Sequence, residues 1–225
     1  MKLASSKKQW PWQKPRPSDR KTAVAQSQLV ILRPKRLEDA EQDYAWRTDP
    51  ELAALDATVP LLVTYREYYR YQRDDMEYPS PWSVRMGVDT LEGRHIGNCM
   101  YYDIDPDRKQ CEMGIMIGDR DYWGRGYGTD AVTALLRHIF TETPIERVYL
   151  HTLAGNVRAQ KAFARSGLKQ VGDVRRDGYD FLKMEAWRDE WLAEHSTDDP
   201  AASSASTPSG QHGTPASRGN GSSPV

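Results

Sequence analysis

Three glycines within five positions, Gly124, Gly126 and Gly128, stand directly before a helical pattern and constrain the fold more than any other feature. Glycine adopts positive φ and has no Cβ, so such a turn lets a ligand approach the main chain. The run DAVTALLRHIF that follows carries apolar side chains at helical spacing. The unpaired N–H groups and the dipole of that helix favour an anion, best a phosphate or pyrophosphate. A plain strand-to-helix turn is the alternative.

Two known phosphate motifs do not fit this turn. A P-loop requires a Gly-Lys-Ser/Thr ending, which the sequence lacks here. A dinucleotide fingerprint requires a small residue where Thr129 stands and an acidic residue at the end of the next strand, and the run RVYLHTL (147–153) supplies none. The glycines alone therefore leave the ligand open.

The segments before the turn predict a strand, helices and then a meander. Residues 29–34 are rich in β-branched residues and leucine and predict a strand that ends at Pro34. Residues 37–57 predict a helix, a break at Asp49-Pro50 and a second short helix, and another helix opens near Thr64. Residues 82–117 alternate with period two and contain the turns LEGR and DPDRK, which predicts three antiparallel strands.

The segments after the turn predict a helix, a strand, a helix and a closing hairpin. Residues 147–153 read as a strand, and the next helix has Asn156 as its N-cap and Gly167 just beyond its end. Two final strands are joined by Asp177-Gly178. The strand–helix–strand unit at 111–153 predicts a parallel pair with a right-handed crossover. The fold class is mixed α/β.

Charge and composition divide the chain into three parts. We predict a disordered basic arm at 1–25, since residues 1–21 carry seven lysines and arginines against one aspartate, a net of +6, while the whole chain is at −1. Residues 26–195 form the predicted domain. The Ser/Pro/Gly-rich tail at 196–225 has almost nothing to bury and is predicted to be disordered. The arm favours a contact with RNA or the ribosome, or is a solvated leader.

The two cysteines and the hydropathy predict the compartment. Cys99 and Cys111 fit a reducing cytoplasm better than a disulfide framework. No apolar run is long enough for a signal peptide or a membrane helix, so we predict a cytoplasmic protein without membrane contact. Whether the chain is a monomer or a homodimer stays open.

The order of these motifs resembles a known family. WGRGYGTDA, preceded by CEMGIMIGDRDY and followed by NVRAQKAFARSGL, is similar to the GNAT acyltransferase superfamily. More narrowly, it resembles the branch of ribosomal-protein N-terminal and spermidine acetyltransferases, as do the opening LRPKRLEDAEQDYAWRTDPEL and the closing RRDGYDFLKMEAW. The resemblance covers roughly residues 28–190. It implies a mostly antiparallel central sheet with a splayed parallel strand pair, flanked by helices.

The same resemblance implies acetyl-CoA as cosubstrate and no metal. The main chain of Met116, Ile117 and Gly118 is expected to pair with the pantetheine arm, and Asn156 lies near the cofactor. The pyrophosphate is expected on the backbone of the glycine turn, at Gly124, Arg125, Gly126, Tyr127, Gly128 and Thr129. Asn156 also fits a helix cap, and both roles hold at once.

The chemistry of amine acetylation asks for a base. At pH 7 an amine with a pKa of about 10.4 is neutral in only about 0.04% of molecules, whereas an α-amino group is neutral in roughly 10–15%. Glu112, on the strand that leads to the glycine turn, is the candidate base, acting through one or two waters. Its alternative is a solvent-facing strand residue alternating with Cys111 and Met113.

One position departs from the family pattern. Where many members carry a tyrosine that returns a proton to the leaving thiolate, this chain has Phe163, which we interpret as a core residue. His151 and Tyr122 are possible substitutes.

The acceptor is expected under the first two helices, near Asp49, Asp56 and residues 73–78, with Tyr179 and Asp180 at its border. The first choice is an α-amino group at a protein or peptide N-terminus. A small amine, such as a polyamine, an amino-acid derivative or an aminoglycoside, is the second. A non-catalytic acetyl-CoA-binding module recruited by the basic arm is the third.

Overall fold

The structure is a computed structural model that describes residues 23–195. The predictions of disorder for the arm and the tail therefore fall almost entirely outside the described residues, as does the expected contact of the arm with RNA or the ribosome. Within the described part, none of the helices is long and apolar enough to cross a membrane.

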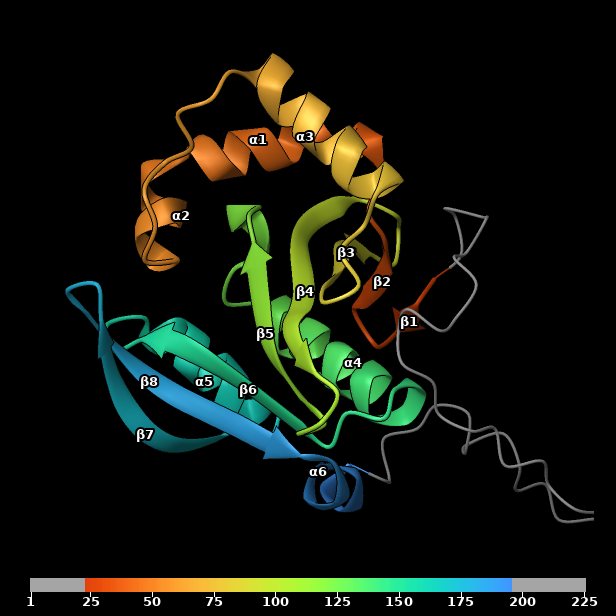
Figure 1. The fold of residues 1–225 in the computed structure, drawn as a ribbon, viewed down its shortest axis with the longest axis vertical. Helices are drawn as coiled ribbons and strands as arrows, with labels where there is room; N and C mark the ends of the chain where they lie inside the picture. Colours follow the sequence, from red (N-terminus) through yellow and green to blue (C-terminus); the bar gives the residue numbers. More distant parts are fainter. Residues whose placement is uncertain (1–22, 196–225) are drawn as a thin grey trace, which may run out of the picture. The chain divides into compact units, whose positions relative to one another are not determined.

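An eight-stranded sheet forms the centre of the domain, in the order β1-β2-β3-β4-β5-β6-β8-β7 (Figure 1). All neighbouring strands are antiparallel except β5 and β6, which are parallel. This is the mixed, mostly antiparallel sheet that the resemblance implies. The strands are β1 Ala25–Gln26, β2 Val30–Pro34, β3 Val84–Thr90, β4 His95–Asp105, β5 Gln110–Ile117, β6 Arg147–Leu153, β7 Lys169–Arg176 and β8 Tyr179–Trp187.

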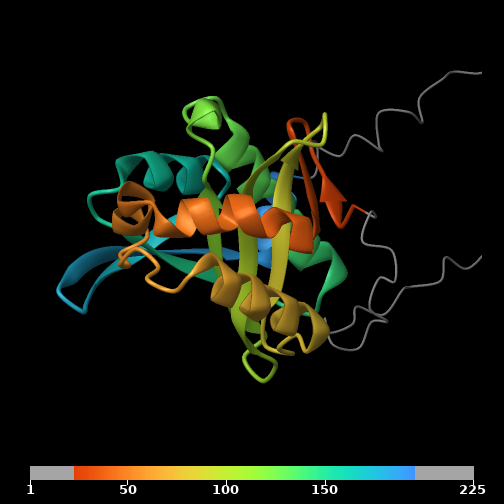
Figure 2. The same ribbon diagram turned by 90° about the horizontal axis from the view of Figure 1, so that it is seen from above.

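Helices cover both faces of the sheet. Figure 2 looks onto α1 and α3, which cross over β3, β4 and β5, and the other face carries α4 and α5. Short 3-10 turns at Leu37–Asp39 and Arg120–Tyr122 precede α1 and the glycine turn. The helices are α1 Ala40–Thr48, α2 Pro50–Leu55, α3 Tyr65–Glu77, α4 Tyr127–Glu142, α5 Val157–Arg165 and α6 Arg188–Glu194.

Local signals in the sequence account for most element boundaries. Asp49 caps α2 through the N–H groups of Glu51 and Leu52, with Pro50 in the first turn, which confirms the predicted break. Thr64 and Glu67 form a reciprocal capping box at the start of α3. The short strand β1 and the terminal helix α6 lacked such signals and were not predicted.

The main core lies between the sheet and α4. The predicted stripe on this helix is confirmed, since its five apolar side chains are fully buried: Val132, Leu135, Leu136, Ile139 and Phe140. Met113 of β5 and Trp191 of α6 belong to the same cluster. Each such side chain contributes about 1.5–3 kcal/mol to folding relative to its exposed state. This packing fixes the direction in which α4 leaves the glycine turn.

The parallel strands separate partway along their length. β5 and β6 pair only at Gln110–Arg147, Cys111–Val148 and Glu112–Tyr149, although β5 continues to Ile117 and β6 to Leu153. The splayed pair implied by the resemblance is therefore present. Beyond Glu112, β5 keeps a strand partner on its β4 side alone.

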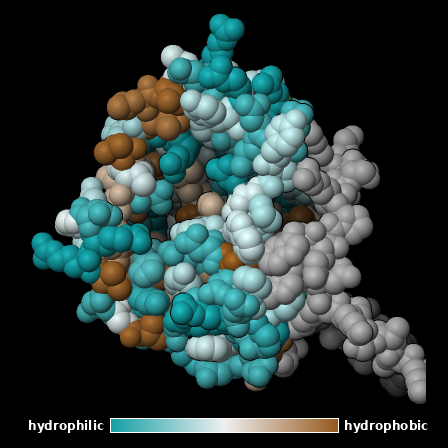
Figure 3. All heavy atoms as spheres, viewed as in Figure 1, coloured by the Kyte–Doolittle hydropathy of each residue, from teal (hydrophilic) through white to brown (hydrophobic). Residues whose placement is uncertain are grey.

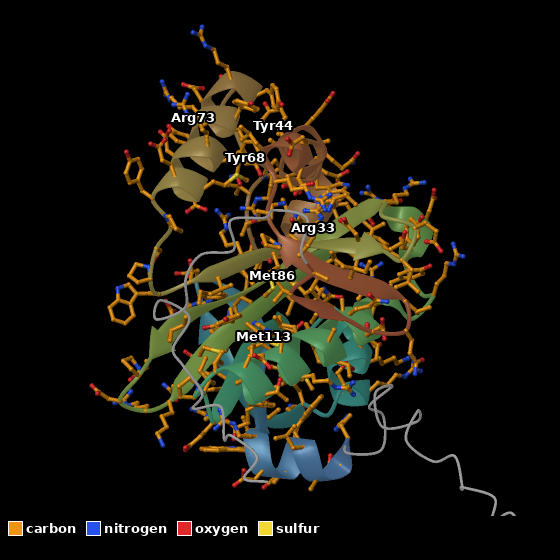
Figure 4. All side chains as sticks on the ribbon, turned by 90° about the vertical axis from the view of Figure 1, so that its right-hand side faces the viewer. Arg33, Tyr44, Tyr68, Arg73, Met86 and Met113 are labelled. Carbon is orange, nitrogen blue, oxygen red and sulfur yellow. The ribbon has the colours of Figure 1, made fainter. Side chains whose placement is uncertain are left out.

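A buried ionic network lies where the sheet meets α1, around Arg33 (Figure 4). The Arg33 guanidinium, 2% exposed, donates to both oxygens of Asp39 and of Asp89. Gly87 leaves the space for it, because a Cβ there would lie 2.5 Å from Arg33 Nη1. His95 bridges Asp89 and Asp43 at 3.2 and 3.0 Å and so extends the network toward α1.

Candidate active site

The glycine turn borders a cavity of about 480 Å³. Its walls come from α2, the end of β5, the glycine turn with the start of α4, and α5. This volume lies within the range of small-molecule sites in proteins. The cavity occupies the gap that opens where β5 and β6 stop pairing, so the splay of the sheet creates it.

The glycine turn presents main-chain N–H groups to this cavity. Gly124 and Gly126 have φ values of +71° and +91°, which only glycine adopts without strain. Gly126 is the N-cap of α4 and no side chain caps the first turn of that helix. The N–H groups of Tyr127, Gly128 and Thr129 thus lack a capping side chain, as an anion site requires.

Backbone groups of β5 alternate between its two neighbours. The N–H of Gly118 donates to the carbonyl of Ile96 in β4, at 3.0 Å, while the carbonyl of Lys109 accepts from Glu146 and Arg147 on the β6 side. Even-numbered residues of β5 therefore face β4, and odd-numbered residues such as Ile115 and Ile117 face the gap. The carbonyl of Ile117 accepts from the indole N–H of Trp123 at 2.6 Å.

This alternation decides which of the three residues expected to pair with the pantetheine arm direct main-chain groups into the gap. Met116 and Gly118 direct their main-chain groups toward β4, so Ile117 is the one of the three predicted residues that directs them into the gap. Ile115, which was not predicted, does the same. Gly118 does not line the cavity but packs under Trp46, where a Cβ would lie 2.1 Å from the indole.

Most of the predicted cofactor residues share the cavity wall. Seven of them line it: Met116, Ile117, Gly124, Gly126, Gly128, Thr129 and Asn156. The side chain of Arg125 donates to the carbonyl of Asp121, and Tyr127 packs edge-on against Tyr122, so neither side chain lines the cavity. Asn156 accepts from the N–H of Ala159 and donates to the carbonyl of Leu55, which confirms the helix cap and ties α5 to α2.

Sequence reasoning missed three cations on α5. Arg158, Lys161 and Arg165 all line the cavity. Their spacing of three and four residues places them on one helix face, and that spacing could have been found in the sequence. Arg158 also lies over the ring of Trp123, with its guanidinium carbon 3.4 Å from the ring centroid. The cavity thus combines main-chain donors with positive charge, which suits phosphate groups.

A second cavity, of about 460 Å³, lies between α1, α3 and the sheet strands β3–β5. Figure 3 shows the molecule hollowed between the upper helices and the sheet, and apolar surface at the upper left, over the loop joining α2 to α3. Tyr68 of α3 lines this second cavity, next to Tyr44 of α1 (Figure 4). Asp56, Ile115 and Met116 line both cavities, so the two meet at these residues.

Glu112 lies close to this junction but lines neither cavity. Its carboxylate is 8% exposed and pairs with Nδ1 of His151 at 3.0 Å. Cys111 and Met113 on either side point into the core. The alternative of a solvent-facing strand residue is therefore wrong, because α1, α3 and the neighbouring strands cover this face.

The residues discussed for the return of a proton to the thiolate lie partly at the first cavity. Phe163 belongs to the core cluster, as interpreted, and also lines the first cavity, as does Tyr122. His151 lines neither cavity.

Of the predicted acceptor residues among the described ones, Asp56 alone lines either of these two cavities. Asp49 caps α2 and pairs with Arg120, and Asp74 and Asp75 pair with Arg73 and Arg85. Tyr179 and Asp180, in the closing hairpin, line neither cavity. In residues 23–195, no group of three or more His, Cys, Asp or Glu side chains is placed to hold a metal ion.

Replacing Gly124 by alanine tests the role of the turn. The positive φ costs about 1–2 kcal/mol of stability for a residue with a Cβ. We expect Gly124→Ala to raise the KM for acetyl-CoA about tenfold, which corresponds to about 1.4 kcal/mol. Gly93→Ala is the matched control, because Gly93 has φ +85° and open space around it but lies in the β3–β4 turn. Equal KM values in both variants would contradict an anion site at the turn.

Comparisons with known proteins agree with this geometry. The family described as acetyltransferase (GNAT) domain matches residues 30–169. An uncharacterized N-acetyltransferase, p20 of Bacillus licheniformis, is 24% identical over 155 residues, which cover 66% of this chain and 84% of that protein.

Solved structures with the same fold include two that contain coenzyme A or a derivative of it. The spermidine N-acetyltransferase of Vibrio cholerae, in complex with CoA and spermine, has a TM-score of 0.65 at 16% identity and covers 72% of this chain and 98% of its own. Mycobacterium smegmatis RimJ, in complex with CoA-disulfide, has a TM-score of 0.59 at 17% identity. The match covers 74% of this chain and 89% of RimJ. At such identities the likeness shows the fold.

Proposed function

Because the chain belongs to the GNAT acetyltransferase family and is an acetyl-CoA-dependent N-acyltransferase acting on amines, we propose that its acceptor is the α-amino group of a protein or peptide N-terminus. The family assignment favours an enzyme over the non-catalytic binding module that the sequence left open. The choice of acceptor rests on the charged side chains that line the second cavity.

The first cavity is assigned to acetyl-CoA. Its pyrophosphate would accept from the N–H groups of residues 124–129, and its pantetheine arm would pair with the gap-facing main chain of Ile115 and Ile117. The cations of α5 would offset the remaining phosphate charge. The residues present fit this substrate, because the helix N-terminus has no side-chain cap and the β5 edge has no strand partner.

The second cavity is assigned to the acceptor. It meets the first at Asp56, whose carboxylate is the one titratable side chain common to both walls among the described residues. The Asp56 side chain is 55% exposed and pairs with Arg47 at 3.2 Å, so its carboxylate is accessible to a ligand in the cavity. An ammonium group bound by Asp56 would stand where the thioester of the donor arrives.

The wall of the second cavity suits an acceptor with one positive charge. It carries three cations, Lys35, Arg47 and Arg85, and two carboxylates, Asp43 and Asp56. Asp43 already accepts hydrogen bonds from Lys35, His95 and Asn98, so it is not available to bind a second ammonium group. A polycation would meet repulsion there, whereas a peptide offers one ammonium group and backbone carbonyls that arginine and tyrosine side chains can bind.

A polyamine is the second candidate. Tyr68, Tyr71 and Tyr102 line the cavity beside Asp56, and aromatic rings with a carboxylate bind alkylammonium groups well. The solved spermidine N-acetyltransferase with bound spermine has the same fold. This candidate requires the cationic side chains of the wall to stay paired with carboxylates while substrate is bound.

Glu112 is assigned as the base. It is the buried carboxylate on this face of β5, and its cross-strand partner Tyr102 lines the second cavity. A carboxylate in this place would take the proton that an ammonium acceptor must lose before its nitrogen can attack the thioester.

Release of free thiol from acetyl-CoA tests the proposal. We expect turnover with peptides that have a free N-terminus and none with the same peptides carrying a blocked N-terminus. Polyamines, aminoglycosides and free amino acids serve as competing acceptors. Turnover confined to polyamines would favour the second candidate, and turnover with no amine would contradict the proposed function.

The role of Asp56 gives a sharper prediction. Asp56→Asn removes the negative charge, so we expect the KM for the amine acceptor to rise about tenfold, a loss of about 1.4 kcal/mol, while the KM for acetyl-CoA stays unchanged. Asp74→Asn is the control, because Asp74 is also an arginine-paired aspartate but lies away from both cavities. If both variants bind the acceptor as the unmodified chain does, Asp56 does not hold the amine.

A further inference from the structure

Glu112 is the assigned base, yet it has no surface on either cavity. The proton of the acceptor must therefore cross a side chain or a water to reach it. Three polar side chains are close to Glu112 on this face of the sheet, namely Tyr102, Tyr149 and His151. Of these three, Tyr102 lines the acceptor cavity and the other two do not.

Strand register places Tyr102 directly beside Glu112. The two residues are partners across β4 and β5, so their side chains lie beside each other on the same face of the sheet. The Tyr102 ring reaches over Gly114, the next residue on the same face of β5, and this glycine also lines the acceptor cavity. A Cβ at Gly114 would lie 3.7 Å from Cε1 of Tyr102. The ring thus extends from Glu112 over Gly114 to the cavity wall.

We propose that Tyr102 is a catalytic residue that carries the proton of the acceptor amine to Glu112. The inference rests on the proposed function, since it requires Glu112 to be the base. His151 positions the carboxylate from the other side, through the contact of its Nδ1 with Oε1.

An ammonium acceptor loses two protons as it becomes an amide. One N–H bond of the ammonium breaks, its proton passes to the Tyr102 oxygen, and the proton of Tyr102 passes to the Glu112 carboxylate. The nitrogen lone pair then forms a bond to the thioester carbon, and the C–S bond breaks. The extra proton still on nitrogen ends on the departing sulfur. The products are the amide, free CoA thiol and a protonated Glu112, which releases its proton to solvent.

The electrostatics of Tyr102 favour a concerted relay. Burial, and next the charge of Glu112, raise the pKa of Tyr102, with further contributions from Asp103 and Asp56. A free tyrosinate is therefore unfavourable, and the hydroxyl must give up one proton as it takes the other. Such a transfer needs the hydroxyl beside the carboxylate, and the cross-strand pairing of Tyr102 with Glu112 places it there.

The test uses the full chain and its best amine acceptor. Tyr102→Phe keeps the ring and removes the hydroxyl. We expect kcat at pH 7 to fall tenfold or more, with the KM values for acceptor and acetyl-CoA unchanged. The loss should shrink as the pH approaches the pKa of the amine, because neutral amine then needs no base. Tyr149→Phe is the matched control, since Tyr149 is also next to Glu112 but outside both cavities.

A double variant separates a relay from a merely structural role. Residues that act as one unit are not additive, so Tyr102→Phe with Glu112→Gln should be no slower than Glu112→Gln alone. An unchanged kcat in Tyr102→Phe, an effect on KM only, or additive losses would each overturn the relay while leaving the acetyltransferase assignment intact. Absence of turnover by the unmodified chain with every amine would instead contradict the proposed function, and the relay with it.

Discussion

Glu112→Gln should lower kcat on an amine of pKa about 10.4 by about 10²–10⁴-fold at pH 7, with the KM for acetyl-CoA unchanged. Glutamine keeps the size and hydrogen-bonding capacity of the side chain but cannot accept the proton. The loss should be smaller for an acceptor with an α-amino group, since roughly 10–15% of it is already neutral. Thiol release measured at several pH values with both acceptor types gives these numbers.

The control for this variant is Glu185→Gln. Glu185 is also a strand carboxylate with a cationic partner, Arg147, but lines neither cavity. Its replacement should leave kcat unchanged. If Glu112→Gln keeps the full rate on every acceptor, Glu112 is not the base.

Arg33→Met should destabilise the domain by about 3–5 kcal/mol at pH 7, the cost of leaving buried charges without their partner. Arg33 is the common partner of Asp39 and Asp89, both nearly inaccessible to water. Urea unfolding of the two chains measures the difference. Arg73→Met is the control, because Arg73 and Asp74 form an exposed pair and such pairs contribute about 0–1 kcal/mol.

The effect of Arg33→Met should depend on pH. Burial opposes the shift, but the Arg33 guanidinium, with His95, Lys35 and the N–H of Arg36, lowers the pKa of Asp39 from 3.8 to about 2. In the unmodified chain this pair therefore contributes stability that is complete above pH 3.8 and is lost as the pH falls toward 2. Without Arg33 the carboxyls protonate more readily, so the difference between the two chains should narrow below about pH 4. A difference independent of pH would contradict an electrostatic origin.

The elements of the fold were largely readable because their signals are local. Thr64 with Glu67, Asp49 with Pro50, and Asn156 each satisfy backbone groups within three residues of themselves. Gly124 and Gly126, directly before α4, have the positive φ values that glycines at a turn indicate. The site that these elements build, the splayed strands with the glycine turn at one end, followed from their order and from the resemblance.

Contacts between residues on neighbouring strands could not be predicted from local sequence signals, because they depend on the register of the strands. Arg33 and Asp89 are 56 residues apart and meet because β2 pairs with β3. Tyr102 faces Glu112 through the pairing of β4 with β5. Which of Met116, Ile117 and Gly118 directs main-chain groups into the gap also depends on register, since a shift of one residue along a strand turns a main-chain group to the other neighbour.

The β5–β6 pairing ends at Glu112, so beyond it the main-chain groups of β5 on that side have no strand partner and can bind an extended ligand. Every residue type except proline carries the same N–H and C=O groups, so side-chain substitutions at these positions alter the donor contacts little. Such a contact surface can persist through extensive divergence of sequence. Solved structures that are only 16–17% identical to this chain, one with CoA and one with CoA-disulfide, nevertheless share its fold.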